Sequence, residues 1–312
     1  MKIKYIFLAL TLLSLSACDD HQVFNDEQYK NVFGFICNSD NVLSQMFTLT
    51  DDTSTGYISF SMGGSNRTTE DVTIDLVEDS TLIDTYNKNT FDRAVEKFAH
   101  KLPKANYDLS SLTCVIKAGE TNGTIPVTIR PEGLSPDTVY FLPVRVSSYK
   151  KCELNPEKST LLYQVTLRNK WAKGDGSSTY TMSGLRAEEG SSEINMPGSK
   201  VMYPLSRNTV RIMAGNESYD ASIETFNKSG LILQIDDNGN VTITPYRDMK
   251  VTQLSGDADY PNTFRVVNDG YNYYKTFLLH YRYQVGTSIY EMKEELRLQY
   301  NPEDADEDLK VK

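Results

Sequence analysis

Aromatic and amide side chains alternate in one short segment of the second half of the chain. Between predicted strands at 264–267 and 276–285, a turn-like stretch from Asp269 to Lys275 contains Tyr271, Asn272, Tyr273 and Tyr274. Aromatic rings stack on the apolar faces of pyranose rings, while amides and carboxylates form hydrogen bonds with sugar hydroxyls. The segment therefore predicts a ligand-binding platform for a glycan at the mouth of two strands.

Two other aromatic residues are weaker candidates for ligand binding. Tyr260 precedes Pro261 in a predicted loop, and Trp171 is the only tryptophan of the chain. Trp171 lies at a predicted domain junction, where a ring buried in the joint is the simpler explanation. The same caution applies to the tyrosine segment, because alternate tyrosines commonly pack into a core or along a sheet edge.

The residues of common catalytic and metal-binding motifs are scattered. The three histidines, His21, His100 and His280, fall in separate parts of the chain, and no Cys-x-x-Cys or His-x-x-x-His pair occurs. No Gly-x-Ser-x-Gly or phosphate-binding glycine loop is present either. A glycosidase needs two facing carboxylates, and none of the 42 acidic residues is singled out for that role. We expect no catalytic activity, no metal and no cofactor.

The composition is that of a folded, acidic protein. Hydrophobic residues make up 39% of the 312 residues and aromatic residues 11%, which is ample for packed cores. The net charge of −10 argues against binding to nucleic acid, because the chain lacks the positive charge that neutralises phosphates. The acidic segment 302–312 is expected to form a disordered tail.

The N-terminus resembles a lipoprotein signal. Two lysines in the first four residues precede an apolar run too short to span a bilayer, and Leu15-Ser16-Ala17 stand directly before Cys18. We expect a signal peptide at 1–17, lipidation of Cys18 and a tether at 18–27. The alternative is an ordinary secretory signal in which Cys18 is incidental.

The remaining cysteines, Cys37, Cys114 and Cys152, are an odd and widely spaced set, which is not a disulfide framework. Cys37 and Cys114 lie in apolar, strand-like segments and are expected to be small buried hydrophobic residues. Whether any two of the three form a disulfide stays open.

The first half of the chain has the pattern of an immunoglobulin-like β-sandwich, which we place at 28–168. Turn residues separate strand candidates at 31–37, 57–62, 72–77, 112–117, 124–130, 138–146 and 160–168. One interruption has a helical spacing, because Phe91, Val95, Phe98 and Leu102 recur at steps of three and four residues before Pro103.

A polar, glycine- and serine-rich stretch at 169–178 is expected to be a linker. After it, segment 179–301 predicts an antiparallel, lipocalin-like β-barrel or a second sandwich, because closure removes exposed strand edges. Alternation places Met292, Leu296 and Leu298 on one face of a strand. Glu294 falls on the same face, and we expect it to pair with an arginine such as Arg265 rather than to catalyse a reaction.

Several motifs resemble a domain found ahead of other modules in surface lipoproteins of glycan-foraging Gram-negative gut bacteria, including some surface endo-β-N-acetylglucosaminidases. The motifs are Tyr86-Asn87, Leu102-Pro103, Tyr107-Asp108-Leu109, the stretch from Val115 to Glu120 and the stretch from Tyr140 to Val144. The second half looks like a lipocalin-like domain of unknown function that often follows, with cues in Tyr260 to Phe264, Phe277 to Tyr283 and Tyr290 to Leu298.

The resemblance implies a place in a polysaccharide-utilisation (Sus-like) gene cluster. It also implies an anchor in the outer membrane facing the cell exterior, favoured in that family by acids such as Asp19 and Asp20, and a porin-type transporter complex as partner. The spaced acids of the family's glycosidase module are missing here.

The leading hypothesis is thus a non-catalytic surface lipoprotein that binds an oligo- or polysaccharide during capture and uptake. The main alternative is a structural, adhesion or complex-assembly lipoprotein with a protein partner and no sugar ligand. A third class, carriage of a small ligand, requires an open apolar cavity in the second domain.

Overall fold

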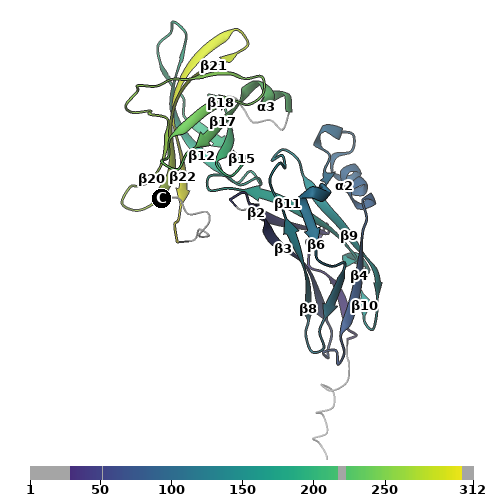
Figure 1. Cartoon of the computed structure of the whole chain (residues 1–312). Helices are drawn as coiled ribbons and strands as arrows, with labels where there is room; N and C mark the ends of the chain where they lie inside the picture. Colours follow the sequence, from purple (N-terminus) through teal and green to yellow (C-terminus); the bar gives the residue numbers. More distant parts are fainter. Residues whose placement is uncertain (1–28, 51, 217–222, 304–312) are drawn as a thin grey trace, which may run out of the picture.

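The computed structural model describes residues 29–50, 52–216 and 223–303 and shows an all-β fold, as the sequence predicts. Two large clusters of buried hydrophobic side chains form two bodies, one with residues from Phe33 to Leu167 and the other with residues from Trp171 to Leu296. Figure 1 shows the two bodies following one another along the chain. The expected signal peptide, Cys18 and the tether lie outside the described residues, as does the tail from 304 onwards.

The first body is a sandwich of two sheets. One sheet has the order β10-β1-β3-β8-β6, and the other has the order β2-β11-β9-β4-β7 with β5 beside β9. The strands are β1 (Val32–Phe35), β2 (Val42–Thr48), β3 (Ser54–Gly63), β4 (Val72–Glu78), β5 (His100–Lys101), β6 (Tyr107–Leu109), β7 (Thr113–Ile116), β8 (Asn122–Ile129), β9 (Tyr140–Tyr149), β10 (Glu153–Leu154) and β11 (Thr160–Arg168). Side chains from both sheets meet in one core.

Every strand predicted in this half is present. Apolar and polar residues alternate in these segments because one face of each strand is buried. In β8, for example, Ile125, Val127 and Ile129 are at most 1% exposed while their neighbours face outward. Strand β2 is not among the predicted strands. It runs parallel to β11 at the edge of its sheet and is only half-buried along most of its length, so its alternation is weak.

The predicted helical segment is misplaced. The helix α2 (Thr81–Phe91) begins ten residues before Phe91, and only a 3-10 turn, η1 (Val95–Lys97), follows it. Further 3-10 turns are η2 (Lys104–Asn106) and η3 (Pro156–Lys158). The Asp79 carboxylate, one residue before the N-cap Ser80, accepts hydrogen bonds from the amide and hydroxyl of Thr81 at the start of the helix.

The predicted linker at 169–178 is a packed joint rather than a solvated chain. Asn169 is 4% exposed, and its side-chain amide donates hydrogen bonds to the carbonyls of Ser206 at 2.8 Å and Thr209 at 3.0 Å. Its amide oxygen accepts from the backbone of Trp171 and Ala172, both at 3.0 Å. The joint therefore belongs physically to the second body.

The second body is built from a seven-stranded and a four-stranded sheet. The orders are β13-β12-β22-β21-β19, with β14 beside β12 and β20 beside β21, and β15-β16-β17-β18. Its elements are β12 (Thr179–Glu188), β13 (Ile194–Asn195), β14 (Gly198–Val201), β15 (Tyr203–Pro204), β16 (Thr209–Met213), α3 (Ile223–Ser229), β17 (Gly230–Ile235), β18 (Val241–Pro245), β19 (Lys250–Gln253), β20 (Thr263–Asn268), β21 (Tyr273–Val285) and β22 (Ser288–Tyr300).

These two sheets curl toward each other into a partly closed barrel. At one corner an isolated bridge joins Asn240 to Thr263, and the side chain of Gln253 spans the gap between β18 and β19. That side chain accepts a hydrogen bond from the amide of Ile243 at 2.8 Å and donates one to the carbonyl of Val241 at 3.1 Å. At the other corner the chain passes from β14 to β15 through a single residue.

Side chains occupy the interior of this barrel. Phe277, Leu279, Tyr281 and Tyr283 of β21 are at most 1% exposed and belong to the second core. The strand predicted at 276–285 is therefore present within β21. An interior that its own side chains fill does not favour the carriage of a small ligand.

One ion pair lies inside the second core. Glu294 is fully buried, its carboxylate pairs with the ammonium group of Lys200, and the hydroxyl of Tyr281 donates to it at 3.0 Å. The expected pairing of Glu294 with Arg265 was wrong. Arg265 lies on the other face of the sheet, since it stands opposite Thr276, whereas Glu294 stands opposite Leu279.

Substitution of Glu294 tests this buried pair. We expect Glu294→Leu to lower the free energy of unfolding by about 3–5 kcal/mol, because it leaves a buried ammonium group without its counter-charge. The double variant Lys200→Met, Glu294→Leu should recover most of that loss. Urea unfolding measures both variants.

Glu153→Gln is the matched control, because Glu153 pairs with Lys30 on the surface, and its unfolding midpoint should equal that of the wild type. A single Glu294→Leu variant as stable as this control would contradict the role of the pair.

Candidate functional site

The predicted ligand-binding segment forms the tip of the hairpin between β20 and β21. The Asp269 carboxylate accepts hydrogen bonds from the backbone amides of Tyr271 at 3.0 Å and Asn272 at 2.8 Å. The Asn268 side chain accepts from the amide of Gly270 at 2.7 Å. Gly270 has a φ of 95°, which residues with a side chain rarely adopt. The tip is thus held by its own hydrogen bonds.

The three tyrosines of the tip have different environments. Tyr271 is 94% exposed and Tyr273 is 43% exposed. Tyr274 is partly buried, and the guanidinium group of Arg297 lies 4.1 Å from its ring centroid. Tyr271 and Tyr273 therefore present aromatic surface to solvent, while Tyr274 forms a cation–π contact within the protein.

Hydrogen-bonding groups of β22 stand beside the tip. The side-chain amide of Gln299 donates to the side-chain oxygen of Asn272 at 3.0 Å. Gln299 and Arg297 are not among the site residues predicted from the sequence. Alternation on β22 indicates that odd-numbered residues face outward, but it cannot show that the register sets Gln299 opposite Tyr274. The two residues add polar groups of a kind that sugar hydroxyls bind.

The electrostatics of the tip centre on Asp269. Hydrogen bonds from the backbone amides of Asn272 and Tyr271 hold the pKa of this carboxyl below its usual range, because they stabilise the charged form. The tip therefore keeps its conformation as long as Asp269 is ionised.

Trp171 is not part of this surface. It is 7% exposed, it belongs to the second core, and its ring lies edge-on to Phe264 with 5.9 Å between centroids. Its backbone carbonyl accepts a hydrogen bond from the hydroxyl of Tyr180. The packed joint thus leaves this ring little surface for a ligand, in line with the simpler explanation that the junction position offered.

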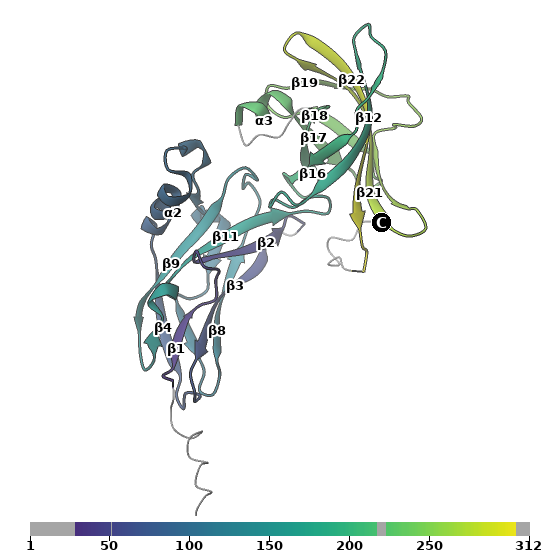
Figure 2. The ribbon, with the colours of Figure 1, turned by 180° about the vertical axis from the view of Figure 1, so that it is seen from behind.

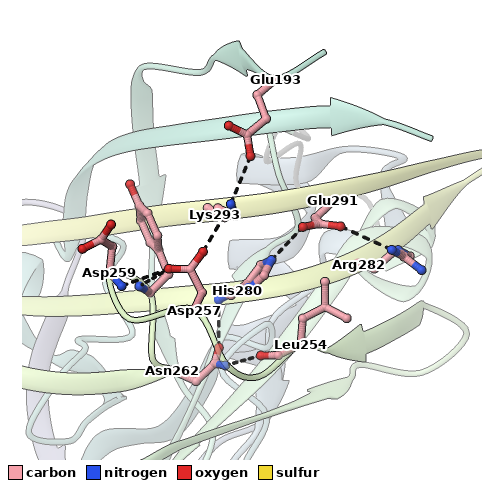
Figure 3. A network of polar contacts seen from close by, with 10 residues as sticks. Glu193, Leu254, Asp257, Asp259, Asn262, His280, Arg282, Glu291 and Lys293 are labelled. Atoms are coloured by element: carbon pink, nitrogen blue, oxygen red, sulfur yellow. Dashed lines mark hydrogen bonds and ion pairs between the residues drawn. The ribbon is translucent and has the colours of Figure 1, made fainter. Parts of the chain in front are cut away.

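Tyr260 lies in a loop that crosses the outer face of β21 and β22. Figure 3 shows how this loop is held: Lys293 pairs with Asp257 at 3.2 Å and with Glu193 at 3.1 Å, and Asn262 accepts from the amide of His280 at 2.8 Å. His280 and Lys293 stand opposite each other in the middle of the two strands. Tyr260 is therefore half-buried near mid-sheet and away from the hairpin tip.

In the part of the chain that the structure describes, no group of histidine, cysteine and acidic side chains could hold a metal ion. Cys37 and Cys114 are free thiols. Burial raises the pKa of the Cys114 thiol to about 11. Within the same residues, no helix is long and apolar enough to cross a membrane.

Comparisons with known proteins agree with the two-body architecture. A family model for an N-terminal domain matches residues 24–152, and a family model for a C-terminal domain matches residues 159–297. A search of curated proteins finds no match.

Several solved structures share the fold. A protein of unknown function from Bacteroides ovatus is 15% identical with a TM-score of 0.66, over 90% of this chain and 99% of its own. A second one from that organism is 17% identical with a TM-score of 0.61, over 93% and 98%. An auxiliary nutrient binding protein from Bacteroides thetaiotaomicron is 15% identical with a TM-score of 0.54, over 85% and 94%. The chain therefore contains this N-terminal domain family followed by this C-terminal domain family, and the solved structures share its fold.

Proposed function

We propose that this protein is a cell-surface lipoprotein that binds glycan without catalysis and so assists polysaccharide capture and uptake. The observation that carries the proposal is the hairpin tip, where an almost fully exposed tyrosine is held on a fixed backbone. Two exposed tyrosines, Tyr271 and Tyr273, lie there beside the amide groups of Asn272 and Gln299, so the tip combines the aromatic and hydrogen-bonding groups that a sugar ligand needs.

The geometry of the tip suits weak stacking on a polymer. A tyrosine ring offers a large apolar face at a low cost in side-chain entropy, because it has only two rotatable torsions. Its neighbours Asn272 and Gln299 offer amide groups to sugar hydroxyls. Each contact of this kind is weak, but a polysaccharide offers many repeats, and many anchored copies of the protein would raise its retention through avidity.

The shape of the molecule supports a location at the cell surface. In both views the start of β1 and the second body lie at opposite ends of the molecule (Figures 1 and 2). With a lipid on Cys18, the sandwich at 28–168 would act as a spacer that raises the body at 179–301 above the outer membrane, beyond a joint at 169–178. The fold shared with an auxiliary nutrient binding protein is compatible with this role, and a porin-type transporter complex is the expected partner.

Retention on polysaccharides tests the proposal. Protein lacking only residues 1–18 should be retarded in affinity gels that contain one of a panel of starch, yeast mannan, xylan, arabinogalactan and mucin. Tyr271→Ala should weaken the retention about 2- to 13-fold, because one stacking contact is worth about 0.5–1.5 kcal/mol.

Tyr57→Ala is the matched control, because Tyr57 is a 48% exposed tyrosine of the first body and its loss should change nothing. If Tyr271→Ala leaves the retention unchanged, the hairpin tip is not the polysaccharide-binding site. Absence of retention on every polysaccharide would favour the structural or adhesion role, with a protein partner.

Asp269 should control the same retention through pH. Its lowered pKa means that ionised Asp269 stabilises the folded tip above the ordinary aspartate pKa of about 3.9, and that this contribution is lost as the pH falls through the folded value. Retention by the wild type should be constant from pH 7 to about pH 5 and fall below about pH 4, whereas Asp269→Ala should bind weakly throughout.

Asp236→Ala serves as the comparison, since Asp236 accepts amide hydrogen bonds in the same way at the β17–β18 turn. If Asp269→Ala is retained at pH 7 as strongly as Asp236→Ala and the wild type, binding does not need a tip held in place by Asp269.

A further inference from the structure

A cleft lies between the two bodies, on the side where α2 and α3 face each other (Figures 1 and 2). Its volume is about 470 Å³, within the range of about 300–1,000 Å³ that is typical of small-molecule sites. The first body contributes Phe98 and His100, which follow α2, and the second body contributes Asn227 and the turn after β18. Neither body alone would form it.

A buried ion pair fixes the two walls relative to each other. Arg211 of β16 is 1% exposed, and its two terminal nitrogens donate to the two carboxylate oxygens of Asp137 from the first body, both at 2.5 Å. The guanidinium group lies 4.1 Å from the ring centroid of Phe226 and 4.9 Å from that of Tyr246. Burial alone would lower the pKa of Arg211, but the hydrogen bonds and charge of Asp137 raise it.

This arrangement makes the floor of the cleft neutral. Asp137 lines the cleft, yet its charge is matched by Arg211 beneath it. Of the other charged lining residues, Glu96 and Asp248 are acidic and Arg247 is basic, so the charges nearly balance. A strongly charged ligand is therefore disfavoured. The polar lining does not suit a lipid either.

The walls combine aromatic rings with hydrogen-bonding groups. Phe98 and Tyr246 are half-buried at the cleft, one on each wall. The turn that carries Tyr246 is held in an unusual conformation, because Arg247 has a φ of 60° and the amide of Asp248 donates to the carbonyl of Asn227 at 3.1 Å. Left-handed backbone at a residue other than glycine costs free energy and clusters at functional sites.

We propose that this cleft binds a short, neutral oligosaccharide, clamped between Phe98 and Tyr246, at a site separate from the hairpin tip. The inference rests on the proposed function, because it assumes that the protein meets glycans. The hairpin tip contacts the surface of a polymer, whereas the cleft takes a short chain or a chain end. In Figure 1, β20 lies on the side of the second body away from α3.

Titration calorimetry with trisaccharides tests the cleft. The probes are maltotriose, mannotriose, xylotriose and N-acetylglucosamine trimer, added to protein lacking only residues 1–18, which keeps every described residue. We expect one probe to bind, and Phe98→Ala and Asp248→Asn, one from each wall, each to weaken its affinity about tenfold. Val95→Ala is the matched control. Val95 is 67% exposed on the 3-10 turn η1, just before Phe98, and does not line the cleft.

Tyr271→Ala separates the two sites. It should leave trisaccharide affinity unchanged while it weakens retention on the polymer gel. Two results would contradict the cleft proposal but not the proposed function. One is retention on a polymer gel with no binding of any trisaccharide, and the other is trisaccharide affinity that neither cleft variant changes. If neither polymers nor trisaccharides bind, both proposals fail. Thermal unfolding of Phe98→Ala and Asp248→Asn confirms that each variant is folded.

Discussion

A buried guanidinium group of the second body pairs with a carboxylate of the first and so links the two bodies beyond the packed joint. Burial of a charge costs free energy unless a well-placed partner of opposite charge offsets that cost. Arg211 has a bidentate carboxylate partner from the first body, and aromatic rings surround its guanidinium group. Loss of Asp137 would leave that charge buried and unpaired, so the interface resists opening. The cleft, and the orientation of the hairpin tip relative to the first body, follow from this constraint.

The sequence predicts well those parts of the fold in which local pattern and burial agree. Alternation indicated β22 because Met292 and Leu296 on its inner face lie in the second core. The helix was misplaced because Ile83 and Asn87 are its only buried residues, so its apolar spacing is weak. The pairs Asp137–Arg211 and Lys200–Glu294 join residues 74 and 94 positions apart, and no local pattern encodes which distant strands meet.

The candidate site was predictable in part for the same reason. Tyr271 was found because a turn between two strands exposes its residues, and the structure keeps it exposed. Trp171 was a weaker candidate because its place at a domain junction favoured burial, and the structure packs it into that joint. The cleft could not be predicted because its walls come from residues far apart in the chain. Among the described residues, the interior of the second body is filled by its own side chains, which directs attention to its surface and to the cleft.

Residual dipolar couplings on the weakly aligned protein test the central constraint most directly. If Asp137–Arg211 holds the bodies together, the couplings of both bodies fit one alignment tensor in the wild type. They should need two different tensors in Asp137→Ala, while Asp71→Ala, which removes a surface partner of Lys117, keeps one. Two tensors in the wild type, or a single shared tensor in Asp137→Ala, would contradict the account.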